Sequence, residues 1–442
     1  IGNFAFFGCS SLKEITLSNK IEAIQHSLFW NCSSLETINI PSSVTTIESN
    51  AFRDCISLKT IKIPSSVVLI GESAFKGCFH LEQICIPSSI TSIKENTFYG
   101  CVALNEVFIS ESVVSIESKA FFGCCSLKEI TIPSSVNSIG RGAFSDCTSL
   151  IRIEIPPSVT KIQDFTFKRC LLLTQVIIPS SVTYIGSNAF YGCFSLRDLE
   201  IPSSVTNIGN SAFYECPSLK IDSIPSSVTL LGQYAFSNCS SIFQMKMPSS
   251  INSINDGCFM NCSSLVYINI PKSVTTIGCD AFNGCISLVN VKIHSSVTQL
   301  KAGAFAKCTS LSEIDIPNSI SVIENNCFEK CSSLVEVSLH DSITVIQKQS
   351  FLGCVSLKEI NIPKYVTSIE SEAFKGCISL QEINVPNCIS FIDATAIPKN
   401  TKIRKYDENE CNIQWYLKSF ALIKKWVNDF DLKLINKDDH KK

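Results

Sequence analysis

The sequence predicts a repeat solenoid, in which units of one length stack on one another and their strands form a parallel β-sheet. A Cys recurs every 23 residues from Cys9 to Cys377, which marks seventeen units without an insertion or deletion. A Phe stands three residues before each of these cysteines, and a Leu stands three residues after each of them except at Ile242. The chain has 442 residues, longer than one compact core usually grows, and repetition extends it.

Each unit is expected to start with a short strand. In the segment from Cys125 to Cys147, Leu127, Ile130 and Ile132 form the pattern LxxIxI, whose last part alternates between apolar and polar residues. Pro133 follows, and Pro occupies this place in thirteen of the seventeen units. Because Pro has no backbone N–H to continue a ladder, the chain is expected to turn there.

The second part of the unit returns apolar side chains to the interior. Val136 and Ile139 point inward, and Ala143, Phe144 and Cys147 close the coil. One unit cannot bury these side chains alone, so units stack with their strands roughly 4.8 Å apart and span roughly 80 Å in total. The side with the Phe is bulkier than the strand side, so we expect the strands on the concave face.

A tight turn is expected just before the repeating Cys. This position is Gly in eight units and Asn or Asp in five, residue types that tolerate a positive φ. Arg169, Glu215, Lys307 and Lys330 depart from the rule and suggest that the turn geometry is not obligatory.

Towards its C-terminus the pattern fades. Residues 1–406 are expected to hold the seventeen regular units and an eighteenth, degenerate unit in which Ala396 and Ile397 replace Ala-Phe. Apolar residues then recur at three and four residues, which predicts an amphipathic helix that caps the solenoid over residues 407–430, followed by a flexible tail over 431–442. The chain opens with Ile1 inside a unit, so we expect that an N-terminal segment has been removed.

Composition excludes several function classes. The net charge is −2, and neither a basic tract nor basic residues interleaved with aromatic ones are found, so no nucleic-acid partner is expected. No apolar run approaches the roughly 20 residues that span a bilayer, which argues against membrane insertion. The five histidines form no zinc motif, and no phosphate loop, dinucleotide fingerprint or nucleophile motif occurs. We therefore expect no catalysis, cofactor or metal.

The recurring cysteines have three interpretations. Neighbouring Cα atoms would lie roughly 5 Å apart, inside the range of a disulfide, but side chains in register lie parallel and seventeen cannot pair completely. Metal sites use paired Cys or Cys/His spacings, and these cysteines come once per 23 residues. The favoured interpretation is a column of buried free thiols that act as small apolar groups.

The unit, written IPxSVTxIGxxAFxGCxSLxxI, resembles the BspA-like or Treponema pallidum-type leucine-rich repeat, and the resemblance covers about 90% of the chain. It implies a horseshoe or gently twisted solenoid. It also implies, as in many members, a non-catalytic protein-interaction or adhesion module at the cell surface or outside the cell that binds a host or matrix protein. The alternative is an intracellular scaffold or recognition domain, which the unpaired cysteines favour.

Outward positions of the strands are the expected partner-binding surface. Glu313, Glu336, Glu359 and Glu382 stack like charges on successive strands, with Asp315 beside them. Because this arrangement is unfavourable, it suggests an acidic stripe for a basic partner or a cation. The alternative is a solvated face relieved by Lys358 and its neighbours.

Three apolar residues stand among the outward polar positions. Phe108, Ile177 and Tyr267 are candidate anchors for a partner, although scattered surface apolar residues are an equal alternative. In the tenth unit Asp222 stands where a buried Val or Ile belongs. A local bulge or slip of the strand is expected there rather than a buried charge.

Overall fold

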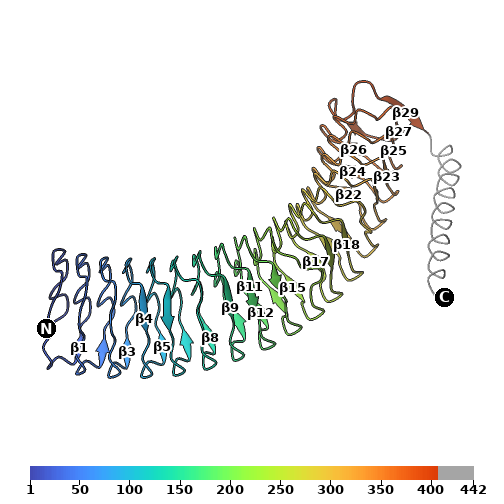
Figure 1. The fold of residues 1–442 in the computed structure, drawn as a ribbon. Helices are drawn as coiled ribbons and strands as arrows, with labels where there is room; N and C mark the ends of the chain where they lie inside the picture. Colours follow the sequence, from blue (N-terminus) through green and yellow to red (C-terminus); the bar gives the residue numbers. More distant parts are fainter. Residues whose placement is uncertain (407–442) are drawn as a thin grey trace, which may run out of the picture.

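The computed structural model describes residues 1–406 and confirms the predicted solenoid of parallel strands (Figure 1). One coil follows another along an arc, and residues 1–406 contain no helix. The predicted cap over 407–430 and the predicted tail over 431–442 lie outside the described residues. Strands pair between coils that are neighbours in sequence, so the molecule is a one-dimensional stack.

The first set of strands comes from the LxxIxI segments. The middle residue is buried and its neighbours face outward, except in the last strand, Lys402–Tyr406, where residues 402–405 are exposed. We call the outward side of these strands the strand face. Strands of this set pair in parallel with a register shift of one unit, for example Gln175 with Arg152. The set comprises β4 (Gln83–Cys85), β6 (Glu106–Phe108), β9 (Arg152–Glu154), β11 (Gln175–Ile177), β13 (Asp198–Leu199), β16 (Gln244–Lys246), β18 (Tyr267–Asn269), β21 (Glu313–Asp315), β23 (Glu336–Ser338), β25 (Glu359–Asn361), β27 (Glu382–Pro386) and β29 (Lys402–Tyr406).

A second set of two-residue strands, which the sequence pattern did not reveal, follows the Pro turn. Its last residue is usually a buried Ile, and these strands also pair from one unit to the next. The set comprises β1 (Ala23–Ile24), β2 (Thr46–Ile47), β3 (Leu69–Ile70), β5 (Ser92–Ile93), β7 (Ser115–Ile116), β8 (Ser138–Ile139), β10 (Lys161–Ile162), β12 (Tyr184–Ile185), β14 (Asn207–Ile208), β15 (Leu230–Leu231), β17 (Ser253–Ile254), β19 (Thr276–Ile277), β20 (Gln299–Leu300), β22 (Val322–Ile323), β24 (Val345–Ile346), β26 (Ser368–Ile369) and β28 (Phe391–Ile392).

The core is a column of Phe rings that runs from Phe6 to Phe374. Consecutive rings are nearly parallel, with centroids 5.2 Å apart at the closest pair, Phe282 and Phe305, and 5.9 Å apart at the widest, Phe305 and Phe328. These spacings exceed the roughly 4.8 Å between neighbouring strands. The Phe side of each coil is therefore the longer side, which is the condition for the predicted curvature.

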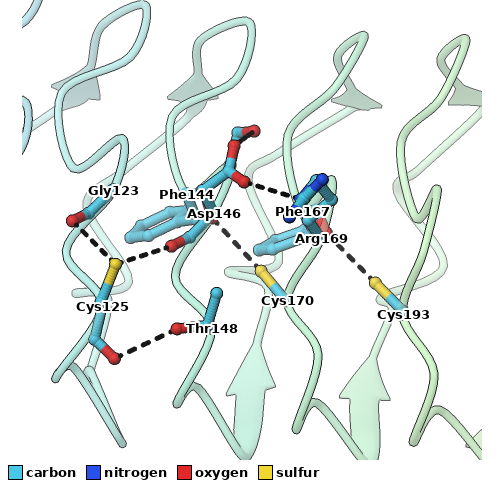
Figure 2. Close-up of polar contacts among 10 residues, drawn as sticks. Gly123, Cys125, Phe144, Asp146, Thr148, Phe167, Arg169, Cys170 and Cys193 are labelled. Carbon is cyan, nitrogen blue, oxygen red and sulfur yellow. Dashed lines mark hydrogen bonds and ion pairs between the residues drawn. The ribbon is translucent and has the colours of Figure 1, made fainter.

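The repeating cysteines form a hydrogen-bonded ladder of free thiols. Each thiol from Cys32 to Cys377 donates to the carbonyl oxygen of the core Phe in the preceding turn, as Cys170 does to Phe144 at 3.2 Å and Cys193 to Phe167 at 3.1 Å (Figure 2). The predicted buried thiols are thus present from Cys32 to Cys377, whereas Cys9 is exposed. The donor role was not predicted. The thiol is a second donor to this carbonyl oxygen, which also accepts the N–H of the Cys three residues later, as Phe144 O does from Cys147 at 3.2 Å.

The turn before each of these cysteines is obligatory, and the prediction that it is not was wrong. Gly77 and Asn238 have positive φ as expected, but so do the exceptions, with φ of 57° at Arg169 and 58° at Lys330. The ladder of hydrogen bonds between turns fixes this backbone, for example Asp146 N–H to Lys168 O at 2.7 Å. A residue with a Cβ accepts the strained conformation because stacking on both sides imposes it.

Coiling continues after the last regular unit. Strand β29 pairs with β27 over five residues, from Glu382 with Lys402 to Pro386 with Tyr406. Ala396 is fully buried in the place of the small residue before the core Phe. The degenerate segment therefore continues the coil, but its strand pairs at an offset of 20 residues (402 − 382) instead of the regular 23.

Candidate binding surface

The tenth unit interrupts the strand face. Asp222 occupies the middle position of its LxxIxI segment, which is apolar in each of the other sixteen regular units, and the structure leaves this residue exposed. Strand β13 ends at Leu199, and no strand of the first set forms before β16. Only a bridge between Ser223 and Lys246 continues the pairing. The charge is therefore not buried, as expected. The strand has not slipped, however, since the bridge keeps the 23-residue register of the regular pairs.

Two hollows flank the interruption, one on each side. The first has a volume of about 630 Å³ and is lined by residues that include Ile177, Ile178, Asp198 and Lys220. The second has a volume of about 400 Å³ and extends from Asp222 across Gln244 to Tyr267 and Asn269. Two of the three predicted anchors, Ile177 and Tyr267, thus line hollows beside the one irregular unit.

An exposed apolar patch adjoins the second hollow. Phe243 is 63% exposed, and Val289 and Tyr267 are also exposed. These residues lie on neighbouring coils, and a hydrogen bond links two of the coils directly: Val266 donates its N–H to the carbonyl oxygen of Phe243 at 2.8 Å. Phe243, Val266 and Val289 directly follow the Leu or Ile of three consecutive strands, where most units carry Lys, Glu or other polar residues. Sequence reasoning missed this column because it examined the two later outward positions only.

Phe108 lies apart from this region. It is exposed at the end of β6, three units before Ile177, and its partner in the neighbouring strand is the exposed Cys85. It lines neither hollow. The three predicted anchors therefore do not form one cluster.

The acidic row lies on the C-terminal part of the strand face. Glu313 is directly opposite Glu336, and Glu359 is directly opposite Glu382, as the register predicted. Asp315 is exposed beside Glu313. Arg404, on β29, forms a salt bridge of 3.0 Å with Glu382. A charge on the degenerate coil therefore relieves the end of the row.

The ladder thiols take no part in chemistry at the surface. They are fully buried, and burial raises the pKa of Cys239 and of Cys331 to about 12. Because the thiolate is the reactive form, these cysteines are inert in the folded chain. Within residues 1–406 no group of three or more His, Cys, Asp or Glu side chains is placed to hold a metal ion.

A stack of LxxIxI coils with a buried ladder and variable outward positions defines a leucine-rich-repeat protein. The model of the BspA type leucine rich repeat region matches residues 1–104, 68–193, 160–289 and 275–404. The chain belongs to this family, whose repeats generally mediate protein–protein interaction and are typically non-catalytic.

Solved structures of leucine-rich-repeat proteins resemble this chain. One from Bacteroides ovatus is 29% identical, with a TM-score of 0.54, over 92% of this chain and 87% of that chain. A leucine rich cell surface protein from Faecalibacterium prausnitzii is 25% identical, with a TM-score of 0.35, over 87% of this chain and 82% of that one. The Treponema pallidum leucine rich repeat protein is 26% identical, with a TM-score of 0.24, over 45% and 71%. No curated protein matches the chain.

The described part of the chain holds no helix that is long and apolar enough to cross a membrane.

Proposed function

We propose that this chain binds a protein partner on its strand face, across the interruption at the tenth unit. One observation carries the proposal: the unit that loses its buried strand residue is flanked by two hollows and adjoins an exposed apolar patch. Hollows beside exposed aromatic residues accept the anchor side chains that dominate binding energy at protein interfaces. Ile177 would contact the partner on one side, and Tyr267 and Phe243 on the other.

The partner we propose is a host or matrix protein, and the place is the cell surface. The family resemblance supports this proposal. The competing proposal, an intracellular scaffold, rested on the unpaired cysteines. Because the ladder thiols are buried and protonated, they resist oxidation in either compartment and support neither proposal. Labelling of intact source cells with a membrane-impermeant biotin reagent tests the location.

A photo-cross-linking residue in place of Tyr267 tests the binding surface. The same residue in place of Tyr365, which is equally exposed at 57% but follows a Pro turn, serves as the control. We expect one partner to be captured through position 267 and not through position 365. With that partner purified, Tyr267→Ala is expected to weaken binding by about tenfold or more. Equal capture from both positions would rule out the proposed surface.

The acidic row supports an extension of the same interface. Carboxylates in register across adjacent strands repel one another, and a basic segment of the partner would remove that repulsion. The double substitution of Glu336→Lys and Glu359→Lys tests this extension. Unchanged affinity for the partner would eliminate the acidic row from the interface and leave the hollows as the site.

A further inference from the structure

We propose a second binding site, on the side of the coils that carries the core Phe, for an acidic peptide segment. We call the stretch around each core Phe, such as residues 141–146, a Phe turn. A hollow of about 680 Å³ lies across the Phe turns that carry Lys119, Arg141 and Lys168, and Phe122 and Phe165 also line it. This site is separate from the strand face, so it stands or falls independently of the function proposed above.

Three cations in this hollow have no carboxylate partner. Lys119, Arg141 and Lys168 form no salt bridge with any residue from 1 to 406. Arg141 and Lys168 instead lie over the ring of Phe165, at 4.8 and 5.5 Å from its centroid. A guanidinium group held against a ring keeps its N–H donors available for a carboxylate. The arrangement is therefore prepared to accept negative charge.

Phe165 has a backbone conformation that its side chain does not favour. Its φ is 60°, in the left-handed region, whereas most units carry Asn, Ser or Gly at this place. Stacking imposes this conformation in every unit, on the aromatic residues Phe4 and Tyr234 as well. The stacked turns compel the backbone, and the Phe supplies a ring between Arg141 and Lys168. Asn, which occupies the equivalent position at Asn188, suits this turn better than Phe, so the turn alone does not explain Phe165.

The charges around the hollow favour a peptide over a dense polyanion. The fourth cation, Arg169, forms a salt bridge of 3.0 Å with Asp146, side by side in Figure 2. Glu95 also lines the hollow, so the lining carries four positive and two negative charges. Two coils beyond the lining on either side, Asp54 and Glu215 occupy the turn before the repeating Cys. A nucleic acid or a sulfated polysaccharide would meet these carboxylates, whereas a segment with a few Glu or Asp residues fits between them.

Fluorescence anisotropy with a short dye-labelled peptide rich in Glu tests the site. The double substitution of Arg141→Glu and Lys168→Glu is compared with that of Lys59→Glu and Lys128→Glu, two exposed lysines of the strand face. We expect the first double variant to weaken peptide binding by about tenfold or more and the second to change it less than about twofold. Circular dichroism verifies that both variants are folded. Equal affinities in the two variants would overturn the proposal.

A second variant keeps the test decisive if the charge reversals unfold the chain. Phe165→Asn relieves the left-handed backbone and is expected to raise the unfolding temperature while it weakens peptide binding several-fold. Unchanged peptide affinity in this variant would overturn the role of the ring. A nucleic acid oligomer or dextran sulfate that binds at Arg141 and Lys168 while the peptide does not would overturn the assignment of the ligand.

Discussion

The tenth unit and its regular neighbours share one core and differ on one face. Leu219, Phe236 and Cys239 are as fully buried as their equivalents Leu127, Phe144 and Cys147. Only the strand face differs, where Asp222 is exposed and the first set of strands is interrupted. The comparison teaches that the Phe column, the thiol ladder and the second set of strands hold the stack, so that outward residues can change without loss of the fold.

The thiol ladder predicts the largest effect, a loss of stability at alkaline pH. Burial raises the pKa of Cys239, Cys285 and Cys331 to about 12, while an unfolded thiol titrates near ~8.5. Between these values the folded chain retains protons that the unfolded chain releases, so stability falls as pH rises, by about 1.4 kcal/mol per pH unit for each thiol. Summed over the ladder, this unfolds the solenoid well below pH ~12. Circular dichroism during a titration from neutral pH measures the midpoint.

Reactivity toward a thiol reagent is the control for this pH prediction. At neutral pH only the exposed thiols among residues 1–406, such as Cys85 and Cys388, should react rapidly. Replacing several ladder cysteines by Ala should move the unfolding midpoint to higher pH. Rapid reaction of the whole ladder in the folded protein would contradict the proposed burial of the thiols.

The core column predicts the next largest effect. Phe213 is fully buried, with ring centroids 5.3 Å from both Phe190 and Phe236. Phe213→Ala should therefore lower the free energy of unfolding by about 3–5 kcal/mol. Phe243→Ala, at an exposed position of the strand face, should lower it by less than about 1 kcal/mol. Urea titration of both variants measures the difference, and similar losses would mean that the patch at Phe243 is part of the fold.

The sequence predicted most of the regular core because every coil buries the same residue types at the same positions. Phe, Leu and Cys recur at fixed places since each must meet its own copy in the next coil. It did not predict the second set of strands, because two residues carry too little periodicity. The sequence also did not predict the positive φ of Arg169 and of Phe165, because stacking imposes this conformation on residues that do not favour it. Of the candidate surface, Ile177 and Tyr267 were identified by their type, but the hollows beside the interruption at Asp222 could not be read from the residue pattern.

Asp222→Ile tests whether the interruption is maintained for function. An Ile can enter the core as its equivalents do, so the strand should form and the free energy of unfolding should rise by about 1–2 kcal/mol. The hollows beside Tyr267 should shrink, and partner binding should weaken. Glu154→Ile is the control, because that residue faces outward, has no core position to enter and lines neither hollow. If the Asp222→Ile variant is more stable and still binds the partner fully, the interruption is not required for binding.

The smallest expected effect is at the acidic row, and its sign is informative. Glu313 and Glu336 are exposed and directly opposite each other, so Glu336→Gln removes a repulsion and should raise the free energy of unfolding by about 0.2–1 kcal/mol. Added salt should reduce this gain because it screens exposed charges. Glu382→Gln should have the opposite sign, since Glu382 has a salt bridge of 3.0 Å with Arg404 to lose. Thermal unfolding of both variants at low and high salt measures these shifts. If both variants are more stable than the original chain, Arg404 does not compensate the acidic row. If both are less stable, each carboxylate has a favourable partner, and no binding role is needed to explain the row.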